Sequence, residues 1–190
     1  RRANALKVSD LDQSLLRHWG VARQTPRDKR RLIGQLKRQL QKTLKSKEVN
    51  PTHGRQLFSK LCSNCHRLHD AGGDLGPDLT GSNRADLNYL LENIVDPNAA
   101  VDKSYILQTI LTTDERVLEG VLQNSDKNSV SLKTVTGPIQ VSRNEIMKMV
   151  NTKMSAMPEG LLLGLKPIEI RDLIAYLQSK EQVPLEKRPE

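Results

Sequence analysis

The stretch Cys62-Ser63-Asn64-Cys65-His66 decides how the rest of this chain is interpreted. A helix opening at Asn50-Pro51 is expected to run into it, because proline is tolerated at the first helical position. The stretch is followed by a loop, residues 70–81, that is rich in glycine and aspartate. Two cysteines three positions apart lie within one helical turn, and a histidine follows the second one directly. All three side chains can therefore bind the same group. The sequence therefore predicts one compact chemical site at the end of a helix.

The spacing of these residues is the one used for covalent attachment of a c-type haem. Two thiols in one turn can add across the two vinyl groups of a porphyrin, and His66 can then ligate the iron from the same side. We therefore expect one covalently bound haem c. Cys62 and Cys65 are predicted to be its anchors and not catalytic nucleophiles.

Two other chemistries also use closely spaced cysteines. Zinc prefers four ligands, and because the chain has no second pair of cysteines, His53 and His69 would have to complete the set. A thiol redox pair would have no use for the adjacent His66. Both alternatives stay open on the five residues alone, and haem attachment is favoured over them.

Downstream of the loop the pattern changes from helix to strand and back. A helix is expected at about residues 86–95, ending before Asp96-Pro97. Segments rich in Val, Ile, Leu and Thr, separated by turn residues, then predict an antiparallel meander of four or five strands, or a small barrel. The four strands located are Tyr105–Thr112, Arg116–Gln123, Ser129–Thr134 and Ile139–Ser142. Residues 151–165 are predicted as loop, and Pro167–Lys180 as a final amphipathic helix.

The first fifty residues predict a basic helical hairpin. One helix is expected over Leu11–Trp19, and a second is expected to begin at Thr25-Pro26. The second helix carries one apolar stripe, formed by Leu32, Ile33, Leu36, Leu40 and Leu44. Because one stripe per helix cannot form a core alone, the hairpin should pack on the rest of the chain or on a region outside this sequence.

The net charge of +8 is concentrated in the N-terminal part. Residues 1–60 hold 16 Lys and Arg against 4 Asp and Glu, a balance of +12, and the remaining residues hold 14 against 18, a balance of −4. Such a split occurs in arms that bind nucleic acid or anionic surfaces. The commoner reason is a solvated helix face, or one that docks on an acidic neighbour. We therefore expect no nucleic-acid partner.

Aromatic residues make up 3% of the chain, so the core must rely on aliphatic side chains or on a large apolar group such as a porphyrin. No run of about 18 apolar residues occurs, and no membrane span is predicted. Because haem is attached to such motifs outside the cytoplasm, we expect a periplasmic or otherwise exported protein. Its export signal is not part of this sequence.

An ordered series of short motifs runs through nearly the whole chain. The series consists of His18-Trp19-Gly20 with Thr25-Pro26, Gly76-Pro77-Asp78-Leu79-Thr80, Leu90-Leu91-Glu92-Asn93-Ile94-Val95-Asp96-Pro97, Met157-Pro158-Glu159-Gly160-Leu161 and Asp172-Leu173-Ile174-Ala175-Tyr176-Leu177. Together with the cysteine motif, it resembles the class I c-type cytochromes and, more narrowly, the planctomycete-type haem-binding domain. That domain occurs at the C-terminus of large exported dehydrogenase-like proteins.

The resemblance implies a mainly α protein with a β insertion. Its core would be a class I cytochrome c helical fold around haem, with an inserted antiparallel meander or small barrel and an N-terminal helical hairpin. The implied domains are a basic hairpin or linker at 1–49, a cytochrome c domain at 50–180 with its β insertion at about 104–150, and a C-terminal tail at 181–190. In that family a glycine, here Gly54, lets the first and last helices cross closely, with an aromatic residue from each at the contact.

The resemblance also implies the surroundings of the iron. The carbonyl of Pro77 would accept a hydrogen bond from Nδ1 of His66, which makes the iron-bound nitrogen more basic. Met157 would supply the sixth ligand, because it lies in a loop ten residues before the last helix. Competing possibilities are Met147, Met149, Met154, a histidine such as His18, and an open site. Asn83 and Arg84 are candidates for binding the haem propionates, although solvated helix caps are an equal alternative for both.

The function that follows is a mono-haem domain that carries single electrons and is not itself an enzyme. Its expected partner is a redox protein or a fused dehydrogenase domain. The alternative is a haem-based sensor or small-ligand-binding module with a weak or open sixth site. A third possibility is a structural or interaction role, with haem stabilising the fold.

Overall fold

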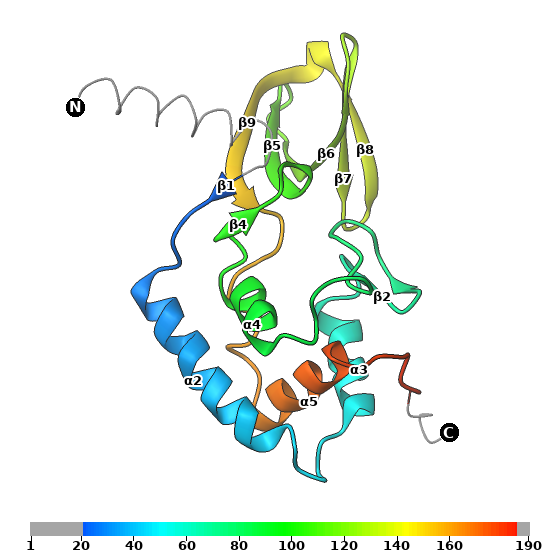
Figure 1. Ribbon diagram of the computed structural model, residues 1–190. Coiled ribbons are helices and arrows are strands. Elements are labelled where there is room, and N and C mark those ends of the chain that lie inside the picture. The colour runs from blue at the N-terminus through cyan, green and yellow to red at the C-terminus, as the bar shows by residue number, and fades with distance from the viewer. Residues whose placement is uncertain (1–20, 186–190) are drawn as a thin grey trace, which may run out of the picture. The chain divides into compact units, whose positions relative to one another are not determined.

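The computed structural model describes residues 21–185, which form two compact units (Figure 1). Of the described residues, the sheet unit comprises 21–24 together with Asn98–Met157, and the helical unit comprises Thr25–Pro97 together with 158–185. The two units are defined by the contacts within each of them, which does not show that either folds alone. The domain boundaries predicted from the sequence therefore stay predictions. The helix expected over Leu11–Trp19 lies outside the described residues.

The fold class predicted from the sequence is wrong. About 27% of the described structure is strand and 33% is helix, which is a β-rich α/β fold and not a mainly α, class I cytochrome c helical fold with a β insertion. The main local error is strand β9, Ile146–Ser155, whose second half was predicted as loop. β9 is an edge strand with many exposed residues, so it lacks the regular alternation of apolar and polar residues that indicates a strand.

The sheet unit is built on a five-stranded antiparallel sheet with strand order β8-β7-β6-β5-β9. Its strands are β5 Ile106–Thr112, β6 Val117–Ser125, β7 Ser129–Thr134, β8 Gly137–Ser142 and β9 Ile146–Ser155. The positions of the four strands located in the sequence are confirmed to within two residues at each end. One face of the sheet buries a small core of Ile110, Val130, Leu132 and Val141. A short pair, β1 Val21–Ala22 with β4 Ala100–Val101, belongs to the same unit.

Within residues 25–97 and 158–185, the helical unit has four helices and one short hairpin. The helices are α2 Arg27–Thr43, α3 Pro51–Leu61, α4 Leu87–Val95 and α5 Pro167–Leu177, and the hairpin strands are β2 Arg67–Leu68 and β3 Ala71–Gly72. The side chain of Asn50 accepts from the amide of His53 and so starts α3, and Asp86 starts α4 by accepting from Asn88. α4 ends at Val95, before Asp96-Pro97 as predicted.

The core of this unit is mainly aliphatic, with the two aromatic rings of Phe58 and Tyr176, and all four described helices contribute to it. α2 contributes the buried residues Ile33, Leu36 and Leu40, which belong to the stripe predicted from the sequence. The first helix of the predicted hairpin lies outside residues 21–185, so the hairpin stays a prediction. α2 packs into the core of the helical unit.

Helices α3 and α5 cross in direct backbone contact at Gly54, and they lie side by side in Figure 1. A Cβ atom added to Gly54 would lie 2.0 Å from the carbonyl oxygen of Asp172, so only glycine fits there. Next to this point the rings of Phe58 and Tyr176 meet edge to face, with centroids 5.4 Å apart. The close crossing expected for Gly54 is therefore present.

Among residues 21–185, no helix combines the length and the apolar character that crossing a membrane would require.

Candidate functional site

The cysteine motif forms a tight turn at the C-terminus of α3. Cys62 caps the helix, with its amide 2.8 Å from the carbonyl of Phe58. The amides of Cys65 and His66 then both donate to the carbonyl oxygen of Cys62, at 3.0 and 2.8 Å. The turn therefore holds both thiols and the imidazole within five residues of one another in the helical unit. All three side chains are half-buried.

The ring of His66 is fixed by the carbonyl of Pro77, whose oxygen lies 2.9 Å from Nδ1. A carbonyl oxygen can only accept, so Nδ1 carries the proton and donates. In the neutral ring, Nε2 then has a lone pair available for a metal ion. This is the contact that the resemblance implies for Pro77, and its role beside an iron ligand stays a prediction.

A glycine-rich segment packs against the motif. Added Cβ atoms at Gly72 and Gly73 would lie 2.1 Å from the carbonyl oxygen of His66 and 2.3 Å from that of Asn64. At Gly76 a Cβ atom would lie 2.6 Å from Cε1 of the His66 ring. The amide of Gly73 donates to Ser63 and the amide of Gly76 to Cys65, at 2.6 and 2.8 Å. The backbone of the glycine-rich segment therefore holds the turn in place. A side chain at any of these three glycines would displace the cysteine motif.

The two thiols are protonated at neutral pH. Both cysteines are free. Burial, with a smaller effect of the neighbouring Cys65, raises the pKa of Cys62 to about 12, and burial also raises the pKa of Cys65. The position of Cys62 at a helix C-terminus, where the dipole is negative, acts in the same direction. Reactive redox cysteines have lowered pKa values, so this environment does not favour a thiol redox pair.

A zinc site is not favoured either. Among residues 21–185, no group of three or more His, Cys, Asp and Glu side chains is arranged to hold a metal ion. The two histidines that would have to complete a zinc site have other partners: His53 Nδ1 lies 2.9 Å from Asp172, and His69 Nε2 lies 3.2 Å from the Ser179 hydroxyl. The two thiols and the imidazole of the motif fit haem better than they fit zinc. Attaching haem requires two thiols to form thioether bonds and one neutral imidazole to ligate the iron.

The methionines proposed as the sixth ligand lie in the sheet unit. Met157 is half-buried, and its amide donates to the Ser155 hydroxyl at 3.1 Å. Met147 and Met154 are exposed, and Met149 packs against the core of the sheet. Met157 is the last residue of its unit and His66 belongs to the other, so the ligand role of Met157 stays a prediction.

Arg84 has a structural role that the sequence did not indicate. Its buried guanidinium donates to the carbonyl oxygens of Leu79, Thr80, Leu177 and Ser179, at distances between 2.5 and 3.1 Å. These bonds connect the loop after the motif to the end of α5. Because four of its five N–H donors are already used within the protein, this arrangement does not favour a propionate role for Arg84. The role stays a prediction for Arg84 and for the exposed Asn83.

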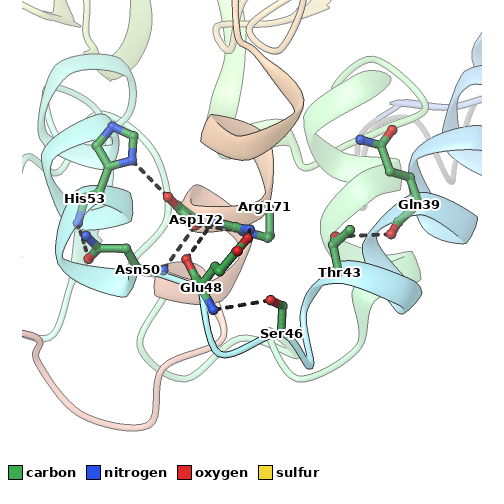
Figure 2. Close-up of polar contacts among 8 residues, drawn as sticks. All are labelled: Gln39, Thr43, Ser46, Glu48, Asn50, His53, Arg171 and Asp172. Atoms are coloured by element: carbon green, nitrogen blue, oxygen red, sulfur yellow. Dashed lines mark hydrogen bonds and ion pairs between the residues drawn. The ribbon is translucent and has the colours of Figure 1, made fainter.

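A second cluster, missed in the sequence, surrounds the buried carboxylate of Asp172 (Figure 2). Its Oδ2 lies 2.9 Å from Nδ1 of His53, and its Oδ1 accepts from the amide of Asn50 at 3.1 Å and from Nε of Arg171 at 2.9 Å. Arg171 also donates to the carbonyl of Glu48 at 2.8 Å. The cluster ties α5 to the start of α3. Residues 48–53 lie more than 100 positions from Arg171 and Asp172, so no local pattern reveals the cluster.

The stability of the helical unit should depend on the charge of Asp172. Burial alone would raise its pKa, but hydrogen bonds from His53, Asn50 and Arg171 outweigh burial and hold the pKa below its ordinary value. The carboxylate therefore stabilises the fold above the unfolded-state pKa of about 3.9, and this contribution is lost as the pH falls through the lower folded-state pKa. Asp172→Asn should reduce the free energy of unfolding at pH 7 by about 1–3 kcal/mol.

Urea unfolding at pH 7 and at pH values below 4 measures this contribution. The difference between wild type and Asp172→Asn should shrink on acidification, whereas Glu181→Gln, an exposed substitution in the same unit, should have little effect at either pH. A difference that does not change with pH would contradict a stabilising carboxylate.

No protein-family model matches this chain, and no curated protein matches it. The family resemblance therefore stays a resemblance, and it rests on the motifs quoted from the sequence.

Proposed function

We propose that this chain binds one haem covalently through Cys62 and Cys65, that His66 ligates the iron, and that the bound group carries single electrons. One observation supports this most directly. In a single turn, two protonated thiols lie beside an imidazole whose Nδ1 is held by the carbonyl of Pro77. This leaves Nε2 as the metal-binding nitrogen. A bound haem would supply the one-electron chemistry of its iron.

The protein's own contribution is to hold the motif rigidly. The glycine segment packs against the motif, and Pro77 orients the ring of His66 and raises the basicity of its free nitrogen. Electron transfer is favoured when ligands move little between oxidation states, and a fixed imidazole meets that requirement. A redox protein or a fused dehydrogenase domain would be the source of the electrons, in a periplasmic or otherwise exported setting.

Replacing both cysteines with alanine should abolish covalent haem attachment, and each single replacement should leave at most one thioether bond. The reason is that each thiol adds to one vinyl group. His66→Ala should prevent normal assembly. The measurement is a haem stain of the denatured protein and its pyridine haemochrome spectrum, after expression with an export signal and the haem-attachment machinery.

Asn64→Ala is the matched control, because Asn64 lies in the same turn with an exposed side chain and should leave attachment unchanged. Two results would contradict the proposal. One is wild-type protein with stoichiometric zinc and no haem, and the other is a normal haem spectrum after His66→Ala.

The sixth ligand is tested by Met157→Ala. If Met157 binds the iron, its loss should remove the sulfur-to-iron absorption band of the oxidised protein, admit carbon monoxide to the reduced protein and lower the potential, since a thioether favours Fe(II). Met154→Ala is the control, because Met154 is exposed and three residues away. Wild-type protein that lacks the band and binds carbon monoxide freely would instead favour a sensor with an open site.

A further inference from the structure

Helix α2 presents a strongly basic face to solvent. With about 100° of rotation per residue, five cations fall within an arc of roughly 120°, nearly opposite the buried residues Ile33, Leu36 and Leu40. We call this the basic face; its cations are Arg27, Arg30, Arg31, Arg38 and Lys42, all of them exposed. One side of α2 is therefore apolar and buried, and the opposite side is positively charged and exposed.

The cations of the basic face are not neutralised within the described chain. No carboxylate of residues 21–185 forms an ion pair with any of them. The contrast is Lys29 on the inward side, whose ammonium lies 2.8 Å from Asp96 and 2.6 Å from Glu159. On the basic face, two like-charged pairs four residues apart, Arg27 with Arg31 and Arg38 with Lys42, weaken the helix.

Gly34 lies in the middle of the basic face without an internal reason to be glycine. A Cβ atom there would meet only Nη1 of Arg38, at an ordinary 3.5 Å. Gly54, the only other glycine in the four described helices, would by contrast clash with backbone. A glycine in a helix interior costs about 1 kcal/mol relative to alanine, so Gly34 destabilises α2 for no benefit within this unit.

Two unfavourable features therefore coincide on one helix face: uncompensated like charges and a helix-breaking residue. Residues that destabilise a helix locally are expected at surfaces that bind a partner. An external surface that neutralises the cations and comes close to the backbone at Gly34 accounts for both. We propose that the basic face, centred on Gly34, is the docking surface for an acidic protein, namely the electron-transfer partner of this chain. The redox nature of that partner rests on the proposed function.

The face fits a protein better than a bilayer or a nucleic acid. The apolar residues of α2 are buried in the core, so the basic face has no apolar group to insert into a membrane. α2 also has no aromatic residue on which a base could stack. A glycine at the centre lets another backbone approach closely, which suits packing against a helix of a partner.

The test measures binding of the full chain to a synthetic helical peptide with glutamates along one face, by fluorescence anisotropy at low salt. Arg31→Glu with Arg38→Glu should weaken binding by roughly tenfold or more, and added salt should weaken binding by the wild type. The matched control is Lys127→Glu with Lys148→Glu, which makes the same change of net charge at exposed positions in the sheet unit and should stay within roughly twofold of wild type.

Gly34→Ala separates docking from simple charge attraction. It should raise the melting temperature, because alanine favours helix, and yet weaken peptide binding by roughly threefold or more, because a methyl group obstructs close approach. Unchanged binding in Gly34→Ala, equal loss in the lysine control, or tighter binding to phosphatidylglycerol vesicles or a DNA duplex would each overturn the proposal. These assays do not depend on haem, so normal haem attachment without peptide binding would refute the docking surface alone.

Discussion

Gly54→Val is expected to unfold the helical unit. A Cβ atom at this residue would overlap the carbonyl of Asp172 and would also lie only 2.8 Å from Cβ of Tyr176. Backbone cannot move aside as a flexible side chain can, so α3 and α5 would have to separate. Separation would break the contact between Phe58 and Tyr176 and uncover the core on both helices.

Gly54→Ala should already reduce the free energy of unfolding by about 3 kcal/mol or more, and valine by more than the protein can tolerate. Circular dichroism and urea unfolding measure both effects. Gly34→Ala provides the matched control, since it is also a helix-interior glycine and should stabilise the protein by about 0.5–1 kcal/mol. Equal effects at the two glycines would show that the backbone crossing at Gly54 does not limit side-chain size.

Arg84→Met should be the most damaging substitution of a single polar side chain. It keeps an apolar stem of similar length but removes every donor. The carbonyls of Thr80, Leu177 and Ser179 then lose the guanidinium that binds them, whereas that of Leu79 keeps Ser82 as a donor. Each unsatisfied buried group costs about 1–3 kcal/mol. Because relaxation and water entry recover part of this, we expect a total loss of about 3–5 kcal/mol.

Two further variants make the Arg84 experiment specific. Arg84→Lys keeps a cation with fewer and differently placed donors, so its urea midpoint should lie between those of wild type and Arg84→Met. Lys180→Met removes an exposed cation from the same unit and should leave the midpoint nearly unchanged. A midpoint for Arg84→Met equal to that of Lys180→Met would mean that the buried bonds contribute nothing.

What the sequence predicts well in this protein is local. The four strands between residues 105 and 142 were located because each has turn residues on both sides and a clear apolar content. α3 begins at Asn50-Pro51 and α4 ends before Asp96-Pro97, because capping and proline sterics act within a few residues. The exposed edge strand β9 has no such signature, and missing it contributed to the wrong fold class.

Contacts between residues far apart in the sequence could not be predicted from local patterns. Asp172 and His53 are 119 positions apart, and neither has a local pattern that points to the other. Buried Arg84 could not be told from a surface arginine, because its partners are backbone carbonyls that carry no residue identity. Gly72 and Gly73 were visible only as part of a glycine-rich loop, although a run of glycines just after a cysteine motif is a signal for close backbone packing.

The discontinuity of the helical unit has a consequence for how the protein is made. α2, α3 and α4 are synthesised before the five strands of the large sheet, and α5 only after them, yet α5 supplies half of the crossing at Gly54. Most strands of that sheet pair with a neighbour along the chain, so these pairs can form before α5 has been synthesised. The core of the helical unit therefore stays open until α5 has been synthesised, and during that interval the cysteine turn is accessible to other proteins.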